Sequence, residues 1–351
     1  KDKTTDITLE NGCANWIMPN AGGAGYWRFK MPEEQWAALG RAFETLTPAE
    51  KLVYADNITA AFSAGDLSAQ ATLDGIRRTA NGEWDVIAEP LGSLSGYLAA
   101  LPEEDQPAMR AWIQRTYGPV YSALASRPAD SLSDSESLLM TSLNNMLMTS
   151  GTMTDEREAL GQAAREFVGV EGEPNPSAVA PSELGLAMDI GAETGGREFY
   201  DAALAFARNS NDQLERSAIL YGIAGHAEAP EVIDLLAAVQ SDDFTGQEAW
   251  SAFQAALRND KAREQAWDIY KASFDDVTAR TPEIRKPQTA GSAGSFCDAD
   301  TLKAAKAFYE SKADVIPGYE RSLAQGVERA ELCIAFRSGK AEELAEAIKR
   351  R

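Results

Sequence analysis

The chain has 351 residues, 44% of them hydrophobic and 25% charged, which is the composition of a globular protein with one large domain or two compact ones. Its net charge of −21 argues against nucleic acid as a partner, because the phosphates would be repelled. No apolar run reaches the roughly eighteen residues that a membrane-spanning helix needs.

The first 31 residues have the pattern of β-strands. The segments 6–9, 15–19 and 26–31 are alternating or rich in aromatic and β-branched residues. Between the last two, Asn20 to Gly25 predicts a turn, because glycines supply the positive φ of a tight reversal. We expect these strands to be the end of a sheet whose other strands lie outside this sequence. The start at Lys1 rather than Met favours the same interpretation, a piece of a longer protein.

From Pro32 onward the pattern is helical. Thr47-Pro48-Ala49-Glu50 is a capping box that predicts a helix running toward Ala64, and Ser133 to Glu136 begins another in the same way. Apolar residues recur at helical spacing in four further segments, within 109–124, 232–239, 250–257 and 267–274. Breakers at 126–128, 169–182 and 281–295 predict loops.

These helices and short connections predict a mainly α fold, an α-α superhelix of HEAT- or armadillo-like helix pairs in residues 32–351, preceded by a few strands in 1–31. Asn211-Asp212 is repeated as Asn259-Asp260 48 positions later, close to the period of such repeats. A compact bundle without repeats is the alternative.

Three cysteines lack the spacing of a metal site. Cys297 precedes a predicted helix and Cys333 lies in a later one, so a disulfide across the last helical hairpin is geometrically feasible. Two buried thiols are the other interpretation of the same pair. A disulfide would favour a periplasmic or secreted protein, whereas a cytoplasmic location stays open without one. Cys13 is left over.

The sequence contains no self-contained catalytic site. Zinc peptidase chemistry needs two histidines one helical turn apart, and His226 is the one histidine of the sequence. It follows an apolar helical segment, so we expect it to close the last turn. A nucleophile elbow and a phosphate-binding loop are both missing. The acidic pairs fall at predicted helix ends, where capping is the ordinary role. We therefore predict no catalytic residue, metal ligand or cofactor in this chain.

The segment Gly25-Tyr26-Trp27-Arg28 resembles the junction in zinc aminopeptidases of the aminopeptidase N family, between a β-sandwich domain and a helical C-terminal domain. Trp27 stands where the family has Tyr, and residues 29–31 replace Val-Asn-Tyr. The segment 47–67, with Asp56 and Gly65, is similar to an early helix of that C-terminal domain. The tail 324–344 resembles closing helices of bacterial members.

The resemblance implies a non-catalytic C-terminal domain that covers the zinc site of the parent enzyme and shapes its peptide cavity. Its partners would be the catalytic domain of the same polypeptide and peptide substrates. A guanidinium could then bind a peptide carboxylate, and our candidates are Arg216, Arg258 and Arg263. The more common role for each is that of an ordinary surface or helix-terminal arginine. The alternatives are a stand-alone helical scaffold that binds a protein partner, and a hydrolase that uses paired carboxylates.

Overall fold

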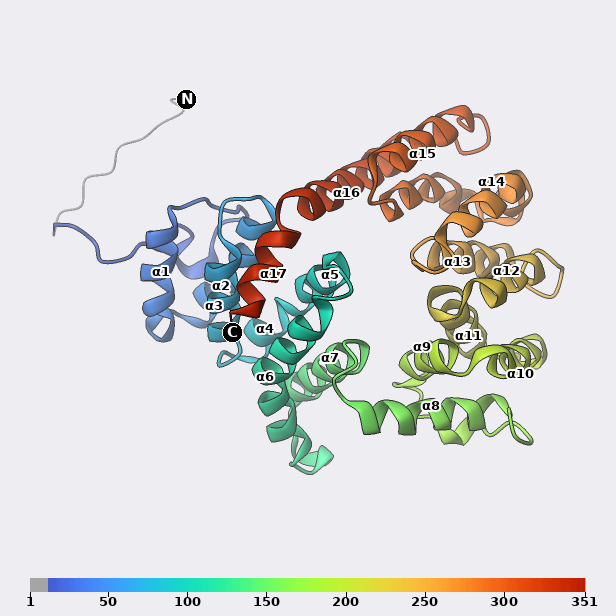
Figure 1. Cartoon of the computed structure of the whole chain (residues 1–351), viewed down its shortest axis with the longest axis horizontal. Coiled ribbons are helices and arrows are strands. Elements are labelled where there is room, and N and C mark those ends of the chain that lie inside the picture. The colour runs from blue at the N-terminus through green and yellow to red at the C-terminus, as the bar shows by residue number, and fades with distance from the viewer. Residues whose placement is uncertain (1–11, 351) are drawn as a thin grey trace. The chain divides into compact units, whose positions relative to one another are not determined.

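The computed structural model of the protein describes residues 12–350, and every regular element in that range is a helix. The described residues contain seventeen α-helices, five 3-10 helices and no β-strand (Figure 1). The mainly α fold class is therefore confirmed, but the strands expected at 15–19 and 26–31 are wrong. The strand expected at 6–9 lies outside the described residues.

Residues 18–31 form a turn and an irregular segment that is hydrogen-bonded to a helix rather than to a sheet. The amide of Asn20 exchanges two hydrogen bonds of 2.8 Å with the backbone of Gly25. The Phe29 N–H donates to Asn57 Oδ1 at 3.0 Å, where a strand would need a backbone carbonyl. The turn itself is as expected, since Gly22 and Gly23 have positive φ. The alternating pattern therefore did not produce a strand, and residues 27–31 carry no regular secondary structure.

The chain divides into two compact units, and α16 begins in the second and ends in the first. Unit 1 comprises residues up to 152 together with 335–351. Its elements are η1 (Ala21–Gly23), α1 (Glu33–Arg41), η2 (Phe43–Thr45), α2 (Pro48–Ser63), α3 (Ala69–Thr79), α4 (Trp84–Ala88), α5 (Leu91–Ala100), α6 (Gln106–Ala125), η3 (Ala129–Ser131), α7 (Asp134–Thr149) and α17 (Ala341–Lys349).

Local sequence explains where α2 and α7 begin. In α2 the hydroxyl of Thr47 accepts from the Glu50 N–H, and the Glu50 carboxylate accepts from the Thr47 N–H. The same reciprocal pair, Ser133 and Glu136, begins α7. A cap of this kind stabilises a helix by about 1 kcal/mol. Both predicted helix starts are confirmed.

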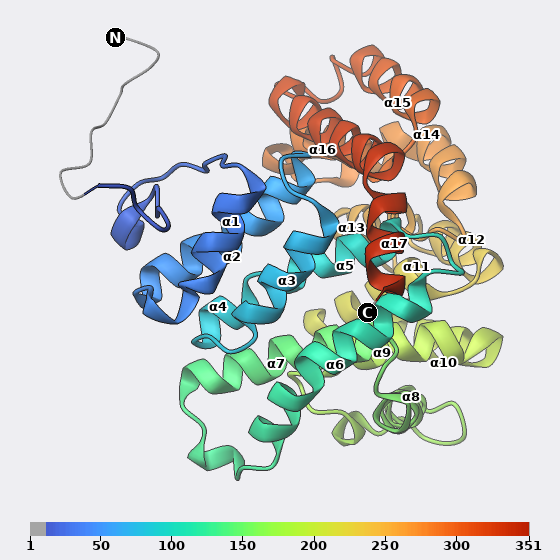
Figure 2. The same ribbon diagram turned by 60° about the vertical axis from the view of Figure 1, so that its left-hand side comes forward.

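The end of the chain packs into unit 1 beside its first helices. α17 contacts α3 and α6 (Figure 2). The Glu343 carboxylate accepts from the Ala69 N–H at 2.6 Å, which caps α3. Phe336, in the last turns of α16, stacks on Tyr97 with 5.3 Å between ring centroids and meets Phe62 edge-on. Residues more than two hundred positions apart thus share one core.

Unit 2 comprises residues 153–334. Its elements are α8 (Thr154–Val168), η4 (Pro176–Ala178), α9 (Leu184–Thr194), α10 (Gly196–Asn209), α11 (Gln213–His226), α12 (Ala229–Ala238), α13 (Gly246–Ala256), α14 (Arg263–Arg280), η5 (Glu283–Ser295), α15 (Ala299–Ser311) and α16 (Glu320–Gly339).

The helices of unit 2 form two stacked rows, as expected for an α-α superhelix. α9, α11 and α13 pack one on the next, and α8, α10, α12 and α14 form the second row beside them (Figure 1). Close approach between α9 and α11 depends on Gly222, because a Cβ there would lie 2.8 Å from the Met188 carbonyl oxygen. The apolar faces predicted at 232–239, 250–257 and 267–274 are buried, and the last of them packs against Phe308 and Tyr309 of α15.

Two expectations about unit 2 need correction. Residues 281–295 are not a loop: Glu283–Ser295 is the 3-10 helix η5. Small residues at 290, 291, 293 and 294 allow this, because a 3-10 helix has three residues per turn and its narrow face can lie close to another backbone. The repeated Asn-Asp pair also does not mark a structural repeat. Its two copies precede α11 and α14, which belong to different rows.

Candidate functional site

Arg216, the first of the three candidate arginines, is fully engaged inside unit 2. Its Nε and Nη2 donate to the two carboxylate oxygens of Glu248 at 2.7 and 3.1 Å, and its Nη1 donates to the Ala207 carbonyl at 2.9 Å. Burial raises the pKa of Glu248, but the hydrogen bonds from Arg216 and Thr245 outweigh it, so the pKa lies below its usual value. Arg216 therefore ties α11 to α13.

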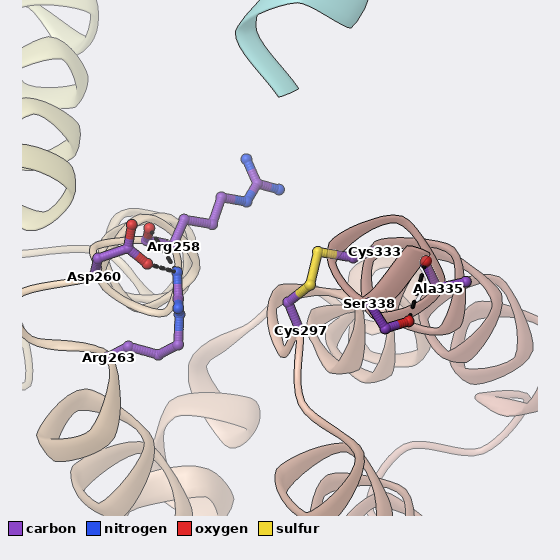
Figure 3. Close-up of a disulfide and its surroundings, with 7 residues drawn as sticks. All are labelled: Arg258, Asp260, Arg263, Cys297, Cys333, Ala335 and Ser338. Atoms are coloured by element: carbon purple, nitrogen blue, oxygen red, sulfur yellow. Dashed lines mark hydrogen bonds and ion pairs between the residues drawn. A yellow bond between two sulfur atoms is a disulfide. The ribbon is translucent and has the colours of Figure 1, made fainter. Parts of the chain in front are cut away.

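Arg263 has a comparable local role. Its Nε donates to the Leu257 carbonyl at 2.9 Å, and its guanidinium lies 2.5 Å from the Asp260 carboxylate. These contacts satisfy backbone oxygens at the end of α13, which have no partner within the helix. Figure 3 shows this guanidinium turned toward Asp260.

Arg258 differs from both. Its side chain extends away from the Asp260–Arg263 pair (Figure 3), and its Nη1 lies 3.5 Å from the Tyr221 hydroxyl, at the outer limit of a hydrogen bond. No carboxylate pairs with it among the described residues. Of the three candidates, Arg258 is the one whose guanidinium stays available to a ligand.

Arg258 lines a cavity of about 270 Å³ that lies wholly within unit 2. One wall is the end of α13, where Trp250, Gln254 and Arg258 follow at intervals of four residues, one helical turn each. They share one face of the helix, so a single segment of sequence supplies an aromatic, an amide and a guanidinium to the same wall.

The other two walls are η5 and α16. From η5 come Gln288, Ser292 and Ser295. From α16 come Ser322, Gln325 and Arg329, which are spaced three and four residues apart and so share a face.

Glycine brings these two walls close together. A Cβ on Gly326 would lie 2.8 Å from the Gly291 carbonyl oxygen and 3.1 Å from the Gly294 nitrogen. Real Cβ atoms do not approach a backbone oxygen so closely, so only glycine allows η5 to lie against α16 at this point.

The lining of this cavity offers hydrogen-bond donors and no negative charge. Two guanidinium groups, Arg258 and Arg329, are its only ionised side chains, in a protein whose net charge is −21. Trp250 Nε1 and Ser292 Oγ are buried behind the lining rather than open to the cavity, and the Ser292 hydroxyl is hydrogen-bonded to Tyr309. The charge of the lining therefore comes from the two guanidinium groups, which favour an anion over a cation.

A disulfide lies beside the cavity. Cys297, two residues after η5, is bonded to Cys333 of α16, and their Cα atoms are 5.4 Å apart (Figure 3). Cys333 follows Arg329 by one helical turn, so the bond holds η5 and α16 together next to the arginine. Cys13 is a free, exposed thiol.

His226 ends α11 as expected, but its ring is directed at a neighbouring helix. Its Nε2 lies 3.6 Å from the carboxylate of Asp189 in α9. Burial raises the pKa of Asp189 to about 6, with a further contribution from Glu193, while His226 opposes the rise. The described residues contain no cluster of three or more His, Cys, Asp or Glu that could hold a metal ion.

In unit 1, the motif residue Arg28 pairs with a residue of the segment 47–67. Its Nη2 lies 2.9 Å and its Nε 3.3 Å from the two carboxylate oxygens of Asp56 in α2. Two of the three stretches that carry the family resemblance are thus in direct contact. Both side chains are partly exposed, so this pair orients the segment more than it stabilises it.

Sequence reasoning missed most of the cavity. Arg329 and Ser292 lie far from Arg258 in sequence, and Ser292 was expected in a loop. One signal was present, the polar stripe Ser322, Gln325 and Arg329 on a helix whose other faces carry apolar residues. A helix face exposed to solvent has the same polar pattern, so the sequence does not distinguish it from a cavity wall. The tertiary packing shows that α13 and η5 lie opposite this stripe.

No helix among residues 12–350 is both long and apolar enough to cross a bilayer. In comparisons with known proteins, the chain is 23% identical over 335 residues to aminopeptidase M1-C of Oryza sativa subsp. japonica, covering 90% of this chain and 36% of that protein. It is 20% identical over 340 residues to aminopeptidase M1-D of the same plant, covering 95% and 38%. The chain therefore spans less than two fifths of the length of these relatives.

Residues 16–332 match the family described as the ERAP1-like C-terminal domain. That range takes in the Gly25–Arg28 segment, all of α1 to α15 and the cavity between α13, η5 and α16. The chain belongs to the ERAP1-like C-terminal domain family.

Proposed function

We propose that the chain is the non-catalytic C-terminal part of a zinc-dependent aminopeptidase of the aminopeptidase N family. In this proposal it covers the active site of the catalytic domain and shapes the cavity for the peptide. The observation that carries the proposal is the family match over residues 16–332, and the two relatives named aminopeptidases support it. The contact between Arg28 and Asp56 adds support, because it joins the two most family-like stretches.

Zinc belongs elsewhere in the proposed enzyme. Structural and catalytic zinc sites take at least three protein ligands from His, Cys, Asp and Glu. The described residues hold no such cluster, and His226 faces Asp189 with no further ligand type gathered around it. The residues present do not fit the ion, so the catalytic domain would supply all of its ligands.

Among the three candidate arginines, we propose Arg258 as the contact for a peptide carboxylate. The donors of Arg216 and Arg263 are occupied by Glu248, Asp260 and backbone carbonyls, so in this proposal they position α11 and α13. We further propose a periplasmic or secreted enzyme, because disulfides persist in oxidising compartments, and a bacterial source from the resemblance of 324–344.

The test is the size and activity of the native protein. An antibody against this chain is used to precipitate the gene product from its own cells. We expect a species much larger than the chain, with aminopeptidase activity that is lost on chelation and restored by zinc. The purified chain should bind no stoichiometric zinc and release no aminoacyl product.

A native species of the chain's own size, without peptidase activity, would contradict the proposal and favour the helical scaffold. Turnover by the purified chain that resists chelator would also contradict it, and would favour a hydrolase built on carboxylates.

A further inference from the structure

We propose that a second cavity, which lies in unit 1 between the segment 20–28, α2 and the end of α4, is a binding site for an organic cation. The ligand group is an alkylammonium or a guanidinium. Such a group has two sources, a free small amine or the basic side chain of a polypeptide. The proposal concerns residues apart from the three candidate arginines, and it does not rest on the proposed function.

The cavity has a volume of about 510 Å³, which is within the range of small-ligand sites. The segment 20–28 forms one wall, α2 forms a second, and the residue that follows α4 closes the third. All three walls belong to unit 1. Apolar side chains and one acid dominate the lining: Tyr26, Trp27, Leu52, Val53 and Glu89.

A glycine allows the Trp27 ring to lie against the main chain and present its other face to the cavity. A Cβ on Gly25 would lie 1.8 Å from the nearest atom of the six-membered ring of Trp27, so the ring rests on the backbone of Gly25. Trp27 is nevertheless 57% exposed, and Tyr26 is exposed in full. An open aromatic face attracts a cation, because its π-electrons carry negative charge.

Three other polar side chains of the lining are already bonded within the protein. Asn20 exchanges two hydrogen bonds with the backbone of its own turn. Asn57 is buried and accepts from the Phe29 N–H. The Asp56 carboxylate accepts from both Nε and Nη2 of Arg28. A neutral polar ligand, such as a sugar, would therefore have few free partners on this lining.

Glu89 is the acid of the lining that lacks a partner. Its carboxylate has no hydrogen bond or ion pair with any residue in the range 12–350. Partial burial and the nearby carboxylates of Asp56 and Asp85 raise the pKa of Glu89, while Arg28 opposes the rise from a distance. A cation beside Glu89 would supply the missing partner and offset the repulsion among these carboxylates.

The apolar part of the lining favours an organic cation over a metal ion. A hydrated metal ion would keep its water and gain little from Leu52 and Val53. An alkylammonium or guanidinium group carries its charge on a body that aliphatic and aromatic side chains can cover. The combination of an open indole face, aliphatic side chains and one unpaired carboxylate therefore points to that class of ligand.

The experiment is calorimetric titration of the purified 351-residue chain. The probes are choline and 3,3-dimethylbutan-1-ol, which have the same shape and differ in the positive charge. We expect choline to bind about fivefold more tightly or better, and to shift the indole N–H resonance of Trp27 more than that of any other tryptophan. Equal binding of the two probes would overturn the proposal, and so would the absence of binding by both.

Two variants test the two recognition elements separately. Glu89→Gln removes the charge and keeps the shape, whereas Trp27→Leu removes the aromatic face and keeps an apolar side chain. Each should weaken choline binding about threefold or more, with an unchanged circular dichroism spectrum. Full affinity in either variant would contradict the site.

Matched controls separate the cavity from general charge and from exposed aromatic surface. Glu34→Gln removes an exposed acid from α1, and Trp84→Leu removes an exposed tryptophan from α4. Neither residue lines the cavity, so neither variant should change the affinity for choline by more than about twofold. A loss in Glu34→Gln equal to that in Glu89→Gln would show that only net charge attracts the ligand, which would overturn the proposal.

The two sources are separated with an octapeptide that carries one central arginine and the same peptide with citrulline in its place. Binding of the arginine peptide, with the citrulline peptide about fivefold weaker or worse, would identify a basic side chain as the ligand. Binding of choline without the arginine peptide would identify a site for a small amine and leave the organic-cation proposal intact. Because neither titration involves a catalytic domain or peptide cleavage, failure here is distinct from failure of the aminopeptidase proposal.

Discussion

At the scale of single residues, burial decides which charged groups are structural. Arg216 and Arg258 belong to the same unit, yet one is held by Glu248 and two carbonyls and the other faces a cavity. Sequence gives both the same chemistry. What separates them is the position of Glu248, which is 4% exposed in its side chain and begins α13 through its bond with Thr245.

The carboxyl group of Asp189 is predicted to make stability depend on pH. Burial raises its pKa in the folded chain to about 6, so ionising it costs more in the folded than in the unfolded state. The group therefore lowers stability progressively as pH rises from about 4 to 6, and the loss is complete above that range.

Asp189→Asn removes this titration. We expect the variant to melt several degrees above the parent chain at pH 8 and at nearly the same temperature at pH 4, measured by circular dichroism. Asp155→Asn, at an exposed position in the first turn of α8, is the control. A variant that melts lower than the parent at pH 8 would show that the contact with His226 outweighs burial.

At the scale of elements, close backbone contacts fix how η5 lies on α16. The contact at Gly326 leaves no room for a side chain, because its Cβ would lie 2.8 Å from the Gly291 carbonyl oxygen. This single contact positions Ser292 and Arg329 on facing walls of the cavity.

Gly326→Ala should destabilise the protein by about 1–3 kcal/mol, because η5 must move away from α16. Gly96→Ala is the control: Gly96 lies inside α5 with nothing within 4 Å of a Cβ, so alanine should stabilise by about 1 kcal/mol. Denaturant unfolding monitored by circular dichroism measures both. Unchanged stability in Gly326→Ala would mean that the two elements can separate at no cost.

The pattern of elements was largely predictable from sequence. The capping boxes at Thr47 and Ser133 and the apolar faces of α6, α12, α13 and α14 are local signals, and each corresponds to a helix. The wrong predictions concern segments whose conformation depends on contact with another element of the fold. Residues 27–31 are irregular, and Arg28 and Phe29 bond to side chains of α2. Residues 283–295 form a 3-10 helix whose glycines lie against the backbone of α16.

At the scale of the whole molecule, one covalent bond links distant segments of unit 2. The disulfide between Cys297 and Cys333 closes a loop of 36 residues, which stabilises the folded state by roughly 4 kcal/mol in the chain-entropy model. Unit 1 contains no disulfide among its described residues.

Reduction should therefore lower the melting temperature of unit 2 by roughly 10 °C. Hydrogen exchange should accelerate in α15 and α16 more than in α2 and α3. Cys297→Ser with Cys333→Ser should reproduce both effects without reductant, and Cys13→Ser should reproduce neither. Equal acceleration in both units would show that the bond stabilises the chain as one cooperative whole.

The sequence by itself determined the helical class, the starts of the capped helices, the lack of a zinc-ligand pattern and the resemblance to a peptidase domain. All of these are read from neighbouring residues or from composition. The tertiary structure alone decided that Arg258 shares a cavity with Arg329 and Ser292 while Arg216 does not. The physical reason is that a binding site depends on which helix faces meet, and the close contact at Gly326 that makes them meet joins residues remote in sequence.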